Sequence, residues 1–139
     1  MNRVVTDASV APKWFITEVH SQEARTLAFG PYELLVPELF PSEFANYLVK
    51  AVRRTEFQPF EAHQVFQITM DRVVVSAAVP LGPRALELAL TLGLSAYDAT
   101  YVALAEASDC PLVTADRRLY DAIRPALAKT VHWIADPLV

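Results

Sequence analysis

Residues 94–119 read LSAYDATYVALAEASDCPLVTADRRL, and the rest of the chain is organised around them. A helix is predicted to begin after Ser95, a suitable N-cap, and an apolar strand to follow it at residues 112–114. Asp116 stands where that strand passes into the next helix, and Asp98 lies near the start of the first helix. The stretch therefore holds two carboxylates near one edge of a sheet.

Two further acids occupy similar places earlier in the chain. Asp7 ends the apolar segment 4–6, and Glu43 follows the apolar segment 34–36, at the head of a helix. In an open sheet of parallel strands the carboxyl ends lie on one edge, where ligands usually bind. Four carboxylates are therefore expected to converge. A divalent metal is the natural counter-charge, because like charges close together make ionisation costly.

The rest of the chain alternates short apolar strands with helices. Strands are expected at residues 4–6, 34–36, 72–75, 112–114 and 131–134. Helices are expected around residues 13–15, after Ser21 as an N-cap, and from about Ser42, Pro59, Arg84, Ser95 and Arg117, the last stopping before Pro125. This alternation favours a three-layer α/β/α sandwich with a mainly parallel central sheet. At 139 residues, residues 1–139 are expected to form a single domain.

Composition excludes several classes of protein. The formal net charge of −4 argues against strong, indiscriminate nucleic-acid binding, which depends on basic groups. The longest apolar stretch, residues 73–81, is far short of the ~20 residues that span a bilayer, so no membrane segment is expected. No secretory signal is recognised, and a cytoplasmic location is expected. The single cysteine, Cys110, is expected to be a small buried filler.

Each of the four acids also has a structural interpretation. Asp7 and Asp116 can be simple N-caps, Ser95-x-x-Asp98 resembles a capping box, and Glu43 in a first turn suits the helix dipole. Capping alone does not explain why all four acids lie near the carboxyl ends of strands. The two interpretations are compatible, because helix amino termini favour negative charge and so keep the acids ionised.

The residue types at this edge favour a hard cation. The edge offers carboxylates and hydroxyls, whereas His20, His63 and His132 are scattered without ligand spacing. Mg²⁺ or Mn²⁺ therefore fits better than zinc. Because a metal held by carboxylates can activate water and stabilise charge on a phosphoryl group, phosphodiester cleavage is the favoured reaction.

Four segments resemble the signature blocks of PIN-domain proteins, most closely those of VapC-type toxins of bacterial toxin–antitoxin systems. They are TDASV at residues 6–10 with Lys13 and Trp14, SEFAN at 42–46, LSAYDATY at 94–101, and TAD at 114–116. The resemblance covers nearly the whole chain, and both the order and the spacing of the blocks agree.

The resemblance implies a Mg²⁺- or Mn²⁺-dependent endoribonuclease, usually a homodimer, that is held inactive by a small antitoxin protein. By position it assigns a metal-binding quartet of acids and three supporting residues: Asp7, Glu43, Asp98 and Asp116, with Ser9, Asn46 and Thr114. Asp121, one turn past Asp116, is left outside this set.

The acidic charge balance leaves few candidates for contacts with RNA. They are Lys13, Lys50, Arg53, Arg54, Arg117 and Arg118. A basic helix end is also a solvated face that complements the dipole, so both interpretations stay open.

Among the aromatic residues, Trp14 and Phe15 are candidates to stack a base or contact an antitoxin. A second group is assigned to core or dimer contacts: Tyr47, Phe57, Phe60, Phe66 and Tyr101. Exposed apolar residues on the helices after Glu43 would suit a partner helix.

Other functions fit the residues less well. A phosphatase of the haloacid dehalogenase kind needs a second Asp two residues after the first, where this chain has Ser9, and a receiver domain expects an acidic pair ahead of Asp7. The alternative from a different class is a non-catalytic PIN-type module that binds RNA or protein. Loss of acids would indicate it, and the quartet is complete.

Overall fold

The computed structural model describes residues 2–138, which contain a five-stranded sheet in the order β3-β2-β1-β4-β5. Every neighbouring pair of strands is parallel. The strands are β1 (Asn2–Thr6), β2 (Tyr32–Pro37), β3 (Val73–Ser76), β4 (Leu112–Thr114) and β5 (Val131–Trp133). The α-helices are α1 (Ser21–Phe29), α2 (Phe40–Arg53), α3 (Pro59–Arg72), α4 (Gly82–Leu92), α5 (Ala96–Ala107) and α6 (Arg117–Leu127), and the 3₁₀ helices are η1 (Ala11–Trp14) and η2 (Val79–Leu81).

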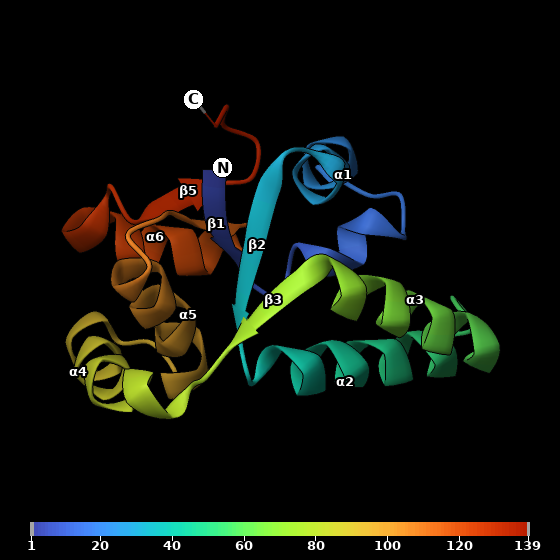
Figure 1. Ribbon diagram of the computed structural model, residues 1–139, viewed down its shortest axis with the longest axis horizontal. Helices are drawn as coiled ribbons and strands as arrows, with labels where there is room; N and C mark the ends of the chain where they lie inside the picture. Colours follow the sequence, from blue (N-terminus) through green and yellow to red (C-terminus); the bar gives the residue numbers. More distant parts are fainter. Residues whose placement is uncertain (1, 139) are drawn as a thin grey trace.

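The helices cover the sheet from two sides. The chain moves from β1 to β2 and β3 in one direction, then returns past β1 to β4 and β5 in the other. Right-handed crossovers place the helices of these two movements on opposite faces. In Figure 1, α1, α2 and α3 accordingly lie on one side of the sheet and α4, α5 and α6 on the other. The predicted three-layer α/β/α sandwich is confirmed, and its sheet is parallel throughout the described strands.

The two central strands carry continuous apolar runs, because helices cover both of their faces. Residues 4–6 of β1 and 34–37 of β2 are all buried, as expected for parallel strands between two helical layers. The edge strand β3 differs, since Val74 and Val75 are exposed. The prediction of these strands is confirmed, with ends that shift by one or two residues.

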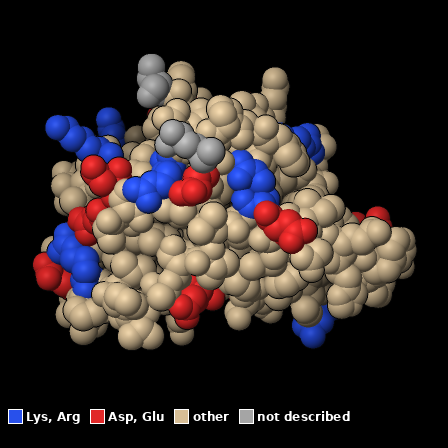
Figure 2. All heavy atoms as spheres, viewed as in Figure 1, with Lys and Arg blue, Asp and Glu red and all other residues tan. Residues whose placement is uncertain are grey.

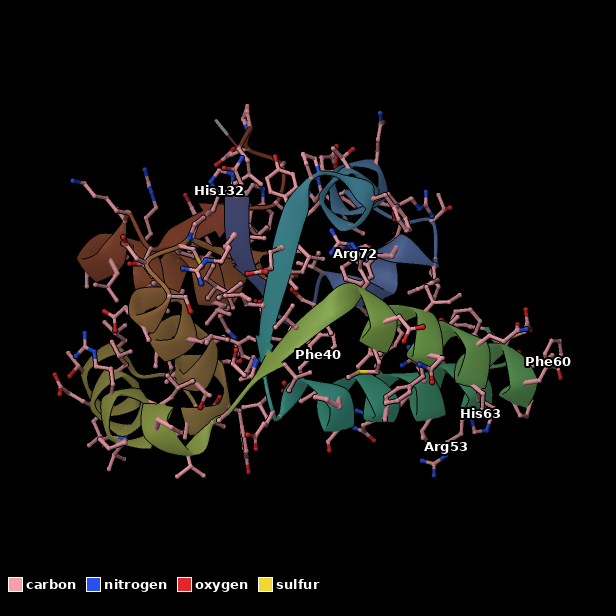
Figure 3. The ribbon with its side chains drawn as sticks, in the orientation of Figure 1. Phe40, Arg53, Phe60, His63, Arg72 and His132 are labelled. Atoms are coloured by element: carbon pink, nitrogen blue, oxygen red, sulfur yellow. The ribbon has the colours of Figure 1, made fainter. Side chains whose placement is uncertain are left out.

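The junction between β2 and α2 is packed rigidly. Phe40 and Phe44 are fully buried, and their rings stack with centroids 5.7 Å apart. Figure 3 shows Phe40 where α2 leaves the sheet. The same core receives Tyr101 of α5, which is 1% exposed. This packing fixes the first turn of α2, in which Glu43 lies.

Two predictions about helix ends are wrong. Ser21 does not cap α1: His20 occupies the cap position with φ of 66°, and the Ser21 hydroxyl accepts from Glu18 N at 2.8 Å and donates to the Ile16 carbonyl. The last helix does not stop before Pro125 but runs to Leu127. Near a helix end a proline removes only one backbone hydrogen bond, so the final turn persists.

No single helix among residues 2–138 is long and apolar enough to cross a bilayer. The pair Val79–Leu92 and Ala96–Ala107 passes by length and composition together, across a bend of 117°.

The glycine at the end of α4 tests how much a left-handed backbone conformation contributes to stability. Gly93 closes the helix with φ of 69°, and a Cβ added there would meet no atom within 4 Å. We expect Gly93→Ala to lower the free energy of unfolding by about 1 kcal/mol, through the left-handed conformation alone. Gly82 has φ of −53° and equally open space, so Gly82→Ala should be neutral or stabilise by about 0.5 kcal/mol. Urea unfolding measures both, and equal losses would contradict this account.

Candidate active site

The site is built around the point where β1 and β4 lie side by side. The chain leaves β1 toward β2 and leaves β4 toward β5, so the two connections diverge. In open parallel sheets a crevice forms at such a switch point, outside the carboxyl ends of the strands. Asp7 directly follows β1, and Asp116 lies two residues after β4. The topology therefore brings these two acids to one place.

Asp7 is buried and held through both carboxylate oxygens. It is 4% exposed. Oδ1 accepts hydrogen bonds from the Ser9 backbone N at 3.0 Å and from the Ser9 hydroxyl, and Oδ2 accepts from the Thr114 hydroxyl at 2.5 Å. Burial raises the pKa of Asp7 to about 6, although the Ser9 and Thr114 hydrogen bonds act in the opposite direction. The two hydroxyl residues singled out in the sequence thus both contact Asp7.

Thr114 also links Asp7 to the start of α6. Its hydroxyl donates to Asp7 and accepts from the Asp116 backbone N at 3.0 Å. Asp116 in turn caps α6, since its Oδ1 accepts from Leu119 N at 3.2 Å. The capping role predicted for Asp116 is confirmed, and it leaves the second carboxylate oxygen available for another partner.

Glu43 and Asp98 lie in the first turns of α2 and α5. Glu43 Oε1 accepts a hydrogen bond from the Tyr101 hydroxyl at 2.6 Å. Asp98 follows the N-cap Ser95, whose hydroxyl oxygen accepts from Asp98 N at 3.0 Å. Burial, and then the neighbouring acid, raise the pKa of each group: Asp98 acts on Glu43 and Asp116 acts on Asp98.

The four acids therefore form one electrostatic group. The negative charge of Asp116 raises the pKa of both Asp7 and Asp98, and that of Asp98 raises the pKa of Glu43. The negative charges of these carboxylates repel one another. Their oxygen atoms therefore fit a hard dication, which would offset that repulsion. Among residues 2–138, no three Asp, Glu, His or Cys side chains lie close enough to hold one ion between them. A cation here would keep much of its water shell, as Mg²⁺ commonly does in proteins.

Comparison with known proteins identifies the family of this chain. The profile of the PIN domain matches residues 4–124. The chain belongs to the PIN-domain family. It is 37% identical over 118 residues to Ribonuclease VapC9 of Mycobacterium tuberculosis, covering 85% of this chain and 89% of that protein. It is 33% identical over 128 residues to Ribonuclease VapC3 of Pyrobaculum aerophilum, covering 90% and 97%.

Solved structures show the same PIN fold. A chain of a toxin-antitoxin complex from Klebsiella pneumoniae superposes with a TM-score of 0.70 at 14% identity, covering 96% of this chain and 99% of that one. At this identity the likeness shows the fold alone.

The other predicted site residue, Asn46, lies one turn beyond Glu43 on α2 of this PIN domain. It is exposed, and the hydrogen bonds recorded for residues 2–138 include none between Asn46 and Glu43. Its proposed orienting role stays a prediction.

One of the six basic candidates, Arg118, acts electrostatically on an acid of this group. The charge of Arg118 lowers the pKa of Asp98, although burial leaves that pKa raised overall. Lys13 Nζ instead lies 3.1 Å from Glu18 Oε1 and donates to the Val19 carbonyl. Lys13 therefore stabilises the loop between η1 and α1. The Arg117 guanidinium lies over the Trp133 ring, 4.5 Å from its centroid.

The remaining basic candidates lie at the far end of α2. Lys50, Arg53 and Arg54 are exposed. By the helical rise, Arg53 is about 15 Å along the axis from Glu43. Arg54 is 3.7 Å from Glu56. On the face shown in Figure 2, the described acidic and basic side chains alternate in small groups. These residues can therefore contact only RNA that extends well beyond the acids.

The structure changes the interpretation of several aromatic residues in this PIN domain. Trp14 is 5% exposed and belongs to the core, so it is not free to stack a base. The sequence predicts core or dimer contacts for Phe60, but in the single chain this residue is 64% exposed and lies outside the core. Trp133 was not singled out in the sequence, yet it ends β5 in register with Thr114. The signal for it was its place within the last predicted strand, residues 131–134.

An apolar groove lies between α2 and α3. Its volume is about 510 Å³, and Leu48, Val49 and Phe66 are among its lining residues. Figure 1 shows α2 and α3 side by side, and Figure 3 shows Arg53 and His63, which also line the groove, at the end of this helix pair away from the sheet. The groove contains the apolar residues that the sequence suggested for a partner helix.

Proposed function

We propose that this PIN-domain chain is a metal-dependent endoribonuclease and the toxin of a toxin–antitoxin pair. The observation that carries the proposal is the group of four carboxylates, from separate parts of the chain, at the β1–β4 crevice, where the charge of Asp116 acts on Asp7 and Asp98 and the charge of Asp98 acts on Glu43. The names of the relatives support the substrate, since VapC9 and VapC3 are called ribonucleases.

In this proposal Asp7, Glu43, Asp98 and Asp116 bind Mg²⁺, partly through its retained water molecules, with Mn²⁺ as the alternative ion. A bound ion of this kind would supply an activated water and stabilise charge on the phosphoryl group. Ser9 and Thr114 keep Asp7 oriented, because they occupy both of its oxygens. Asp98 and Asp116 lie at the amino termini of α5 and α6, where the helix dipole attracts negative charge.

The RNA would approach along the crevice. Arg118 is the basic residue best placed to bind a phosphate there, because its charge already acts on Asp98. Phosphate contacts position an RNA chain without reading its sequence. RNA is found in the cytoplasm, where the chain would act.

We further propose that a small antitoxin protein binds this chain and that two copies form a homodimer. The antitoxin is supported by the Klebsiella pneumoniae structure, which is described as a toxin-antitoxin complex. The apolar groove between α2 and α3 supports the binding of a partner helix.

An RNA cleavage assay tests the function. With Mg²⁺ or Mn²⁺ the purified chain is expected to cut labelled RNA internally, and EDTA is expected to abolish cleavage. Asp98→Asn should reduce kcat/KM by more than about 100-fold, because residues that merely orient a metal ligand are worth 10–100-fold. Asp121→Asn is the matched control, since Asp121 is exposed on α6, and it should stay within about threefold of wild type, as surface changes usually have small effects.

Two results would contradict the proposal. Cleavage that continues in EDTA would exclude a dependence on the metal. Tight RNA binding without cleavage under any of these conditions would favour the non-catalytic PIN-type module.

A further inference from the structure

Tyr101 joins two of the candidate acids through a single helix. It lies on α5, three residues after Asp98 and therefore on the same helical face. Its ring is 1% exposed, and its hydroxyl donates to Glu43 Oε1 at 2.6 Å across 58 residues of sequence. One helix thus carries Asp98 and also the group that contacts Glu43.

The hydroxyl is a permanent donor. Burial, followed by the hydrogen bond and negative charge of Glu43, raises the pKa of Tyr101 far above its ordinary value. In this contact the phenol is therefore the donor and the Glu43 carboxylate the acceptor. A neutral donor beside a carboxylate favours its ionised form, and this hydrogen bond accordingly acts to lower the pKa of Glu43, which burial raises.

The contact also restricts the position of Glu43. A glutamate has three side-chain torsions, and Glu43 is only half-buried, so packing alone leaves the carboxylate several orientations. The Tyr101 ring is fixed in the core, and a bond of 2.6 Å to Oε1 selects one of these orientations. A carboxylate held through one oxygen keeps the other for a cation.

We propose that Tyr101 is a positioning residue that holds the Glu43 carboxylate in its cation-binding orientation. The inference rests on the proposed metal-dependent function. The sequence predicts core or dimer contacts for Tyr101, so its polar role comes from the structure alone. Groups that orient metal ligands typically contribute 10–100-fold to metal affinity or activity.

Binding of Mn²⁺ alone, followed by electron paramagnetic resonance, tests this role without RNA. Tyr101→Phe removes only the hydroxyl, and it is expected to weaken Mn²⁺ binding by about 10- to 100-fold. At saturating Mn²⁺, kcat should return to within about threefold of wild type, because the ligand itself is still present. Glu43→Gln should not recover in this way. Tyr32→Phe, at the amino end of β2, is the matched control and should bind Mn²⁺ like wild type.

A double-mutant cycle separates positioning from packing. If Tyr101 acts through Glu43, adding Tyr101→Phe to Glu43→Gln should weaken Mn²⁺ binding no further. Additive losses would overturn the proposal, as would wild-type affinity in Tyr101→Phe while Glu43→Gln binds weakly. If Tyr101→Phe does not fold, the cycle is run with Tyr101→His, which keeps a hydrogen-bond donor on its ring. Tyr101→His is expected to bind Mn²⁺ more tightly than Glu43→Gln does. Failure of wild type itself to bind Mn²⁺ would instead refute the proposed function, and Tyr101 with it.

Discussion

Asp7→Asn is expected to lower kcat/KM for cation-dependent RNA cleavage by more than about 100-fold, the limit for residues that only orient a ligand. The substitution is nearly isosteric and keeps an oxygen for the Ser9 hydrogen bonds. It removes the negative charge at the centre of the β1–β4 crevice. Activity should therefore fall through loss of the cation and not through loss of the fold.

Cleavage of labelled RNA over a range of Mn²⁺ concentrations measures this effect. Asp109→Asn is the matched control, because Asp109 is exposed at the turn after α5 and has φ of 49°, which asparagine tolerates. It should leave cleavage unchanged. Full activity in Asp7→Asn would show that Asp7 has no part in the reaction.

The same substitution is expected to stabilise the cation-free protein at pH 7.5. Because burial raises the pKa of Asp7 from 3.8 to about 6, the folded state binds this proton more tightly than the unfolded state does. The free energy of unfolding therefore falls as the pH rises from about 4 to about 6, and the loss is complete above the folded pKa. At 1.36 kcal/mol per unit, Asp7→Asn should gain up to about 3 kcal/mol at pH 7.5 and little at pH 4.

Urea unfolding of both proteins in EDTA, from pH 4 to pH 8, measures this difference. The gain should grow between pH 4 and pH 6 and then stay constant. A gain of equal size at every pH would mean that the asparagine acts through packing and not through the charge. Loss of activity together with a gain in stability is the mark of a residue retained for function.

The sequence was sufficient to predict the strands, their parallel arrangement and the sheet edge at which Asp7 and Asp116 lie. This succeeded because 4–6 and 34–36 are short apolar runs, each followed by an acid and a helix. Strands covered on both faces carry such runs, and parallel strands end at one edge. The capping of α5 by Ser95 and of α6 by Asp116 was also readable, because it depends on residues three positions apart.

Contacts between distant segments could not be predicted from the sequence. The Tyr101–Glu43 hydrogen bond joins α5 to α2, and no local pattern specifies that the two helices meet at these residues. Trp14 was misjudged for the same reason, since its burial depends on how η1 packs against the rest of the fold. His20 occupies the cap position of α1 because Ser21 bonds backward to its own loop, a choice that depends on the shape of the loop.

An anomalous difference map from crystals grown with Mn²⁺, recorded at the manganese absorption edge, tests the central claim most directly. The account predicts a peak in the crevice between β1 and β4, within reach of the carboxylates of Asp7, Glu43, Asp98 and Asp116. A peak bound only elsewhere on the protein, or a crevice without one at saturating Mn²⁺, would contradict it.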